Sequence, residues 1–513
     1  MNRYANFLLP VTLLLYAACC ILLHPWLGYM LDSDATAYLT MAEKAARGEW
    51  LQSVNALWSP LNAWLIAPFI RLGYDAWLVA KCLNIFFGAI LLFQLHGFFR
   101  CFGWPVFYRL ALLKTAAVFL SFAVYFQVFG DVLQLVFVLL FIRILISDSF
   151  PHHIIWHFLG GAVMGIAYYA KAYSMFYFLV LNVVVMLLFY IKKKLNHREA
   201  LIRSGIGIST ALLFALPLNW AIYKKYGEFS ITGLAGKLNM SWYIQSGKSF
   251  RSDIHLLIPP VTPGATSFWE DPFPTQQDLT HPLQSVSSFI HWIARVIHTC
   301  LNAVLCMNEI SFLALAILLA ALYTFFIRYK IRESYYTREQ VLTLSACILP
   351  LGYLMMHIET RYIWLEVFLT MILGTQLFSI WYTGNKAAIK KTGILLLASS
   401  YLIFPLVQTE ALRYKNKDLF DWAAALKQKN WSGRFTSNAT DAGRMWVLAY
   451  LTHSSFYTIE KQNYSREQLL SEMKHYQVPY YFFCSENNLN GVQPDTAFNP
   501  LIHLSGLDVL ELK

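Results

Sequence analysis

The chain has 513 residues, of which 57% are hydrophobic and 13% are charged, a balance far more apolar than a soluble protein of this length requires. Its net charge of +11 does not indicate a nucleic-acid partner, because Lys and Arg stand in short runs between apolar stretches, such as those beginning at Ile191 and Ile327. Seven of the eight cysteines lie in or beside apolar stretches and none forms a CxxC pair, so neither a disulfide framework nor a cysteine metal site is expected.

Apolar stretches recur along the first four fifths of the chain, and about eleven have the roughly 20 residues needed to cross a bilayer. The stretch from Phe7 to Trp26 lacks a small-residue cleavage site and is followed by further apolar stretches, so we interpret it as a retained first helix rather than a signal peptide. We therefore predict an α-helical polytopic membrane protein with about eleven transmembrane helices.

The charged connections between these stretches predict the topology. A cytoplasmic N-terminus puts the basic connections on the inner side, as the positive-inside rule requires, at residues 100–109, 192–203, 328–338 and 386–391. The outer side then receives a first loop at residues 28–74, a long loop at residues 224–291 and the polar tail. The predicted division is a transmembrane domain at residues 1–409 and an extracytoplasmic domain at residues 410–513.

The first outer loop opens with two acids, Asp32 and Asp34, and continues with apolar residues at helical spacing, among them Tyr38. This spacing predicts an amphipathic helix at the membrane interface. Either acid is also suited to a simpler role, capping the free N–H groups at the start of that helix. The WSPLN element at residues 58–62 is expected to end the loop and open the second span, because Pro60 is tolerated in a first helical turn.

Further charged residues stand at the ends of apolar stretches, on the outer side by this topology. They are Asp131, Lys171, and the pair Glu359 and Arg361, which Tyr362 follows. Charges at membrane depth are costly and indicate function, and an ammonium or guanidinium there attracts phosphate. The alternatives are a helix N-cap for Asp131, a snorkelling Lys171, and an internal Glu359–Arg361 pair. One polar cavity at the membrane boundary would collect all of these side chains.

The long outer loop and the tail carry weaker signals. The loop is rich in proline and aromatic residues, which is typical of a lid over a site and equally of a passive connection. Its aromatic residues are suited to stacking on a sugar or an isoprenoid, or to an interfacial position: Trp242, Tyr243, Trp269 and Phe273. The tail predicts a small α/β domain, with helical spacing at residues 420–429 and 465–476 and a β-prone run at residues 478–484.

The order of these elements resembles the membrane glycosyltransferases of the GT-C superfamily, in particular the bacterial branch similar to protein O-mannosyltransferases and the lipid A aminoarabinose transferase. The resemblance covers residues 1–410 and rests on the acidic first loop, WSPL, the lysine after GGAVMGIAYYA, ALPLNWAIYKKYGEFSITG and the ETRY turn. Asp34 matches the family's first-loop acid, since Tyr38 follows at the family's spacing. Ala35 replaces a Glu found in many relatives, so Asp32 remains an alternative to Asp34 as the main acid.

The resemblance implies a glycosyltransferase that moves a sugar from a polyprenyl-phosphate donor to a lipid, glycan or protein acceptor, with inversion, on the extracytoplasmic face of a bacterial inner membrane. Lys171 and Arg361 would bind the donor phosphate, and Asp34 would bind or deprotonate the acceptor. Asp131 or Asp32 would orient the acceptor or hold an ion, which leaves a divalent cation open. The competing interpretations are a transporter or lipid flippase, and a noncatalytic scaffold whose tail binds a partner.

Overall fold

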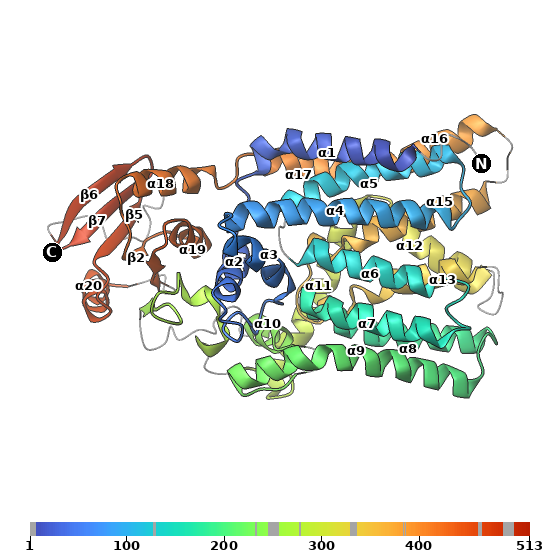
Figure 1. Ribbon diagram of the computed structural model, residues 1–513, viewed down its shortest axis with the longest axis horizontal. Coiled ribbons are helices and arrows are strands. Elements are labelled where there is room, and N and C mark those ends of the chain that lie inside the picture. The colour runs from blue at the N-terminus through green and yellow to red at the C-terminus, as the bar shows by residue number, and fades with distance from the viewer. Residues whose placement is uncertain are drawn as a thin grey trace.

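The computed structural model describes residues 7–126, 130–230, 233–244, 256–275, 279–328, 336–382, 384, 386–459, 464–485 and 497–513. Long helices lie side by side in a bundle, and a small domain of mixed strands and helices sits at one end (Figure 1). Seven helices in the described ranges are long and apolar enough to cross a membrane: α1 (Leu8–Leu27), α4 (Ala76–Arg100), α5 (Val106–Phe126), α8 (Tyr173–Ile191), α9 (His197–Tyr226), α11 (Val286–Ile310) and the continuous pair α16 (Ala387–Ser400) and α17 (Ile403–Ala411).

The predicted membrane character is confirmed, but the predicted number of spans is higher than the seven long helices. The difference arises because several apolar stretches form shorter helices within the bundle. Among them, α6 (Asp131–Leu145) has 15 residues, and α7 (Ile154–Ala170) and α15 (Leu365–Trp381) have 17 each. A further short apolar helix is α12 (Ala314–Leu322), which continues as η4 (Tyr323–Arg328). The short helix α13 (Thr337–Ile348) is more polar.

Two basic connections share one end of the bundle. The connections after α4 and after α8, which carry Arg100 and residues 192–194, lie at the end away from the C-terminal domain (Figure 1). Local signals fix the helix ends there: Asn196 and Glu199 form a capping box that starts α9. These two basic connections thus lie at the end of the bundle opposite the domain, and the sidedness predicted from the positive-inside rule stays a prediction.

At the domain end, the first loop folds into α2 (Ser33–Ala46) and α3 (Leu61–Arg71), which pack against each other. Two expectations are corrected here. The WSPLN element opens α3, an 11-residue helix, so the next membrane-length helix begins at Ala76. The predicted helix α2 is present, but residues 35–42 are all buried, because α3 and the C-terminal domain cover faces that were expected to lie at the interface.

The tail forms a five-stranded sheet in the order β3-β2-β5-β7-β6. Parallel pairing joins β2 (Arg434–Ser437) to β3 (Ser455–Phe456) and β5 (Tyr480–Cys484), whereas β7 (Leu507–Leu512) runs antiparallel to β5 and β6 (Phe498–Leu504). The helices are α18 (Lys417–Gln428), α19 (Ala442–Leu451) and α20 (Arg466–His475). The helices and strand predicted in the tail are confirmed as α18, α20 and β5, while the domain boundary at residues 409 and 410 stays a prediction.

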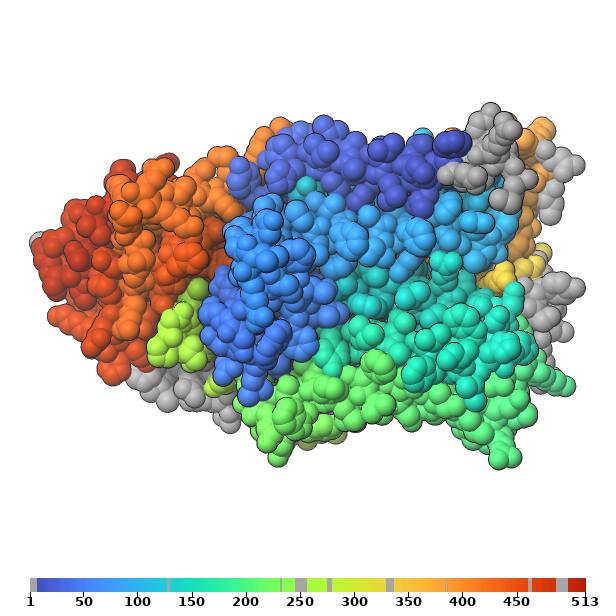
Figure 2. Space-filling view, viewed as in Figure 1, coloured from blue at the N-terminus to red at the C-terminus, as the bar shows by residue number. Residues whose placement is uncertain are grey.

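Residues 256–275 of the long outer loop form a segment that we call the strap. Its strand β1 (Leu257–Ile258) pairs antiparallel with β4 (Thr458–Ile459) of the C-terminal domain. Two short turns follow, η2 (Phe268–Glu270) and η3 (Phe273–Thr275), and a helix of the same loop, α10 (Ala235–Ile244), precedes the strap. In Figure 2 the yellow-green strap lies between the blue first loop and the orange and red domain. The strap is therefore part of the packed structure rather than a free connection.

Candidate active site

A cavity of about 680 Å³ lies at the domain end of the bundle, where α2, α6, the junction of α7 and α8, α10 and η2 meet. Its wall combines charged and polar side chains with apolar and aromatic ones, which is typical of a site for an amphipathic ligand. The predicted site residues that line it are Asp34, Tyr38, Asp131, Lys171, Glu359, Arg361 and Tyr362. Asp32 is the one predicted site residue that does not line it. Side chains that are far apart in the sequence are thus brought to one space, as predicted.

The Lys171 ammonium and the Asp131 carboxylate form an ion pair in the cavity wall. Asp131 is the first residue of α6, where Gly130 with φ 70° takes the N-cap position. A side chain at position 130 would come within 3.1 Å of the Tyr38 hydroxyl, so both the backbone and the space favour glycine. Asp131 therefore does not serve as the N-cap, and Lys171 is held in the wall instead of snorkelling outward.

Lys171 also faces a stack of three tyrosines. Its ammonium lies 4.2 Å from the ring centroid of Tyr362 and 5.7 Å from that of Tyr353. The Tyr362 and Tyr353 rings stack at 4.7 Å, and Tyr173 stacks on the far side of Tyr353 at 3.8 Å. Burial lowers the pKa of Lys171, whereas the charge of Asp131 acts to raise it, and the electron-rich ring faces also favour the cation.

Arg361 lies in the turn η5 (Thr360–Ile363) between two carboxylates. Its Nε is 2.7 Å from Glu359 Oε2, and its Nη2 is 3.7 Å from Asp34 Oδ2. The internal Glu359–Arg361 pair therefore exists, and Arg361 reaches the first loop as well. The Glu359 carboxylate also faces His357 Nε2 at 3.1 Å, and His357 Nδ1 lies 3.0 Å from Arg295 Nη2 on α11.

These contacts fix the charge of Glu359. Burial acts to raise the pKa of Glu359, but the hydrogen bond from His357 and the positive charge of Arg361 outweigh it and lower that pKa to about 2. Because Arg295 donates to His357 Nδ1, the proton of a neutral His357 ring lies on Nε2, where it is donated to Glu359. Glu359 is thus ionised at neutral pH and orients Arg361.

Asp34 occupies the first turn of α2, with 34% of its side chain exposed to the cavity. Its Oδ1 accepts a hydrogen bond from Trp269 Nε1 at 3.2 Å. Burial and the nearby charge of Asp32 raise the pKa of Asp34 to about 6, against the opposing effects of Arg361 and Trp269. A carboxyl with this pKa changes its protonation state just below neutral pH.

Asp32 has a different place. It is the N-cap of α2, and its Oδ1 accepts a hydrogen bond from the backbone N–H of Ala35 at 2.7 Å. The capping alternative therefore describes Asp32 and not Asp34. Between the two acids that the sequence left open, Asp34 is the one in the cavity.

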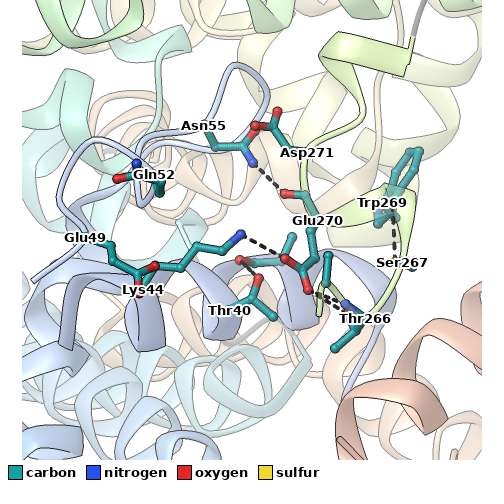
Figure 3. A network of polar contacts seen from close by, with 12 residues as sticks. Thr40, Lys44, Glu49, Gln52, Asn55, Thr266, Ser267, Trp269, Glu270 and Asp271 are labelled. Carbon is teal, nitrogen blue, oxygen red and sulfur yellow. Dashed lines mark hydrogen bonds and ion pairs between the residues drawn. The ribbon is translucent and has the colours of Figure 1, made fainter. Parts of the chain in front are cut away.

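A second polar cluster lies outside the cavity, under the strap (Figure 3). Glu270 pairs with Lys44 at 2.9 Å and accepts hydrogen bonds from the backbone N–H and the hydroxyl of Thr266 at 2.6 and 2.9 Å. Asp271 pairs with Lys225 at 2.7 Å. We call these five residues the strap cluster: Lys44, Lys225, Thr266, Glu270 and Asp271. They fasten the strap to α2 and α9.

Sequence reasoning missed several residues of the site, among them His357, Tyr353 and the strap cluster. One signal was available for His357, because a histidine stands two residues before Glu359 in the same outer connection. In the described ranges, no group of three or more His, Cys, Asp or Glu side chains lies close enough to hold a metal ion. The described side chains thus offer no clustered ligand set for the divalent cation that the sequence left open.

Comparisons with known proteins bear on the fold. No family model matches the chain, and no curated protein matches it in sequence. Among solved structures, the chain is similar to ArnT from Cupriavidus metallidurans bound to undecaprenyl phosphate, with a TM-score of 0.51 and 12% identity. The match covers 97% of this chain and 97% of that chain. This integral membrane protein thus has a fold resembling that of ArnT over nearly its whole length, and the predicted resemblance is confirmed at the level of the fold.

Proposed function

We propose that this protein transfers a sugar from a polyprenyl-phosphate donor to an acceptor bound in the 680 Å³ cavity. The observation that carries the proposal is the convergence of two cations, Lys171 and Arg361, and one acid of raised pKa, Asp34, on that cavity. The fold supports the choice of donor, because the ArnT of similar fold was solved with undecaprenyl phosphate.

The donor phosphate would bind to Lys171 and Arg361. An ammonium has three N–H donors. In the part of the chain that the structure describes, Lys171 donates to a single acceptor, Asp131, which leaves donors for a ligand. When the bond between the sugar and the phosphate breaks, negative charge grows on the phosphate, and preorganised cations stabilise it. Asp131 and Glu359 would position these cations rather than touch the sugar.

Asp34 would act on the acceptor. The acceptor oxygen or nitrogen forms a bond to the anomeric carbon, its proton passes to Asp34, and the polyprenyl phosphate leaves with the electrons of the broken bond. A displacement of this kind by one nucleophile inverts the anomeric configuration. A pKa of about 6 suits the task, since the group is ionised at neutral pH and still accepts a proton. Asp32 would support this step by capping α2 and, through its charge, by raising the pKa of Asp34.

The reaction would take place on the extracytoplasmic face of a bacterial inner membrane. The basic connections gather at the opposite end of the bundle, where the positive-inside rule places the cytoplasm. The acceptor would then be a component of the cell envelope, whether a lipid, a glycan or a protein. Tyr38, beside Asp34, and the tyrosine stack would shape the walls for the sugar.

The test is transfer of labelled sugar from a panel of polyprenyl-phosphate donors by the purified protein, with envelope extracts as acceptors. We expect transfer by the wild type and a loss of about 100-fold or more in Asp34→Asn. Asp32→Asn is the matched control and is expected to keep most of the activity. A folded protein that neither transfers nor hydrolyses sugar from any donor would overturn the proposal in favour of a transporter. Full activity of Asp34→Asn would remove the acid from the mechanism.

A further inference from the structure

Trp269 joins the cavity to the C-terminal domain. On one side its indole N–H donates to Asp34 Oδ1 at 3.2 Å. On the other side its ring stacks on Trp446 of α19, with ring centroids 4.8 Å apart and an interplanar angle of 9°. One side chain of the strap thus contacts both the acid of the site and a helix of the domain.

Trp446 is itself held by the domain. Its indole N–H donates to the Thr458 hydroxyl at 3.0 Å, in the strand β4 that pairs with the strap. The Phe268 ring packs edge-on against Trp446, with centroids 5.5 Å apart and an interplanar angle of 90°. The two tryptophan rings therefore cannot shift past each other unless the strap also moves.

Backbone contacts at two places join the strap to the domain, both ahead of these rings in the chain. The β1–β4 pairing lies before η2, and the backbone N–H of Phe456 donates to the Thr266 carbonyl at 2.8 Å. The domain also contacts α2 directly, since the Tyr450 hydroxyl donates to Glu43 Oε1 at 2.8 Å. Domain, strap and α2 are thereby tied into one unit around Asp34.

We propose that the C-terminal domain positions Asp34, the acid that accepts the proton. Trp446 holds the Trp269 ring, and the Trp269 N–H holds one oxygen of the Asp34 carboxylate. Trp269 and Trp446 are positioning residues in this proposal, which rests on the proposed function. Each oxygen of the Asp34 carboxylate then has its own partner. Oδ1 accepts a hydrogen bond from Trp269 Nε1, and Oδ2 lies 3.7 Å from Arg361 Nη2. Fixing the carboxylate plane in advance keeps it at the angle needed for proton transfer.

The link also affects protonation. A hydrogen bond to the ionised form favours that form, so Trp269 lowers the pKa of Asp34, and its loss would raise that pKa. Other titratable or charged groups face Asp34 from α2, α10 and the η5 turn, and they stay unchanged when Trp269 is replaced: Asp32, Tyr38, Tyr243, Glu359, Arg361 and Tyr362. A shift of the pH profile in a Trp269 variant therefore reports the lost hydrogen bond.

The first experiment compares the pH dependence of transfer in three full-length variants. Trp269→Phe keeps an aromatic ring for the stack but loses the donor, and we expect its acidic limb to move to higher pH with a fall of about tenfold in kcat. The KM for the donor should stay near the wild-type value, because Lys171 and Arg361 are intact. Trp446→Leu should shift the limb in the same direction, and Trp446→Phe, which restores a ring, should recover most of the loss.

The matched control is Trp431→Phe, since Trp431 packs in the core of the same domain, 4.8 Å from the Phe482 ring. It should lower the unfolding temperature without moving the pH profile. If Trp269→Phe and Trp446→Leu lower the unfolding temperature and leave the profile and kcat at wild-type values, the two residues are merely structural and the proposal is wrong.

A second measurement needs no activity. Hydrogen–deuterium exchange of the backbone amides at residues 33–37 should accelerate in Trp446→Leu and stay unchanged in Trp431→Phe. Unchanged exchange together with an unchanged pH profile in an active protein overturns the positioning proposal alone. A wild type that transfers no sugar overturns the proposed function. The contact between Trp446, Trp269 and Asp34 then has no catalytic role, even if Trp446→Leu still accelerates exchange at residues 33–37.

Discussion

Two lysine–aspartate pairs lie at the same end of the bundle and are equally buried. In Lys171–Asp131 of the cavity and in Lys225–Asp271 of the strap cluster, the lysine side chain is 21% exposed and the aspartate 8%. Their bonding differs. Lys225 donates to Asp271 and to the carbonyls of Val54 and Gln52, at 2.7, 2.6 and 3.3 Å, so each of its N–H groups has an acceptor.

The difference teaches that burial and ion pairing do not distinguish a functional charge from a structural one. A lysine whose donors are all satisfied by protein has nothing to offer a ligand, whereas Lys171 faces a cavity and, among the described residues, donates to one carboxylate. We expect the first kind of pair to determine stability and the second to determine activity. The experiments on the two pairs and on the strap cluster test this comparison, and those on Asp34 and Asp32 sharpen the cavity side of it.

The largest effect is expected when each pair is removed whole, so that no charge is left unpaired. The double variant Lys171→Met with Asp131→Asn should lose binding of undecaprenyl phosphate and lower transfer by on the order of 100-fold. The matched double variant Lys225→Met with Asp271→Asn should bind and transfer normally and unfold at a lower temperature. Titration calorimetry and the transfer assay measure both. Equal loss of transfer in the two variants would break the comparison.

The cavity charges were predictable from the sequence, because a charged residue at the end of an apolar stretch is costly and therefore informative. Asp131, Lys171 and Arg361 were identified in this way, and the structure brings them together. Their pairing was not predictable, since Lys171 and Asp131 are joined across 40 positions of sequence.

The strap cluster could not be predicted from the sequence, for a physical reason. Lys225 lies in the last turn of α9, where a lysine is ordinary, and Asp271 lies in a proline-rich loop, where an acid is ordinary. The two-residue strands β1 and β4 are too short to produce a periodic pattern, and they pair across about two hundred residues. Long apolar helices are local features that sequence reveals, whereas the fastening of the strap is a tertiary one.

A smaller effect, a fall in kcat of about tenfold per pH unit, is expected when the pH is lowered below the pKa of Asp34. In the proposed mechanism Asp34 acts as an anion, and burial with the charge of Asp32 raises the pKa of Asp34 to about 6. The group gains its proton as the pH falls through about 6, so kcat should be level above pH 7 and fall about tenfold per unit well below pH 6. A rate profile between pH 4.5 and 8.5 checks this. A profile that stays flat to pH 5 would show that no carboxyl of this pKa takes part.

Substitutions in the strap cluster should lower the free energy of unfolding rather than the rate of transfer. Glu270→Gln keeps an acceptor for Thr266 but removes the charge that pairs with Lys44, so we expect a loss of about 1–3 kcal/mol in unfolding free energy. Transfer per folded molecule should stay within about threefold, as for variants away from a reacting centre. Glu228→Gln is the control, because the Glu228–Lys237 pair is exposed and should contribute little. A large loss of kcat without loss of stability would place the strap cluster in the reaction.

The smallest effect is expected at Asp32, which sequence alone could not separate from Asp34. Asn caps a helix about as well as Asp, so Asp32→Asn should leave the unfolding temperature nearly unchanged. The variant removes a negative charge that raises the pKa of Asp34, so that pKa should fall and the acidic limb of the rate profile should move to lower pH. At pH 7.5 Asp34 is ionised in both proteins, and their rates should agree. Loss of a neighbouring charge moves the acidic limb of the rate profile and leaves the plateau unaltered. Replacing the proton acceptor would lower the plateau itself, so this pattern distinguishes the two roles.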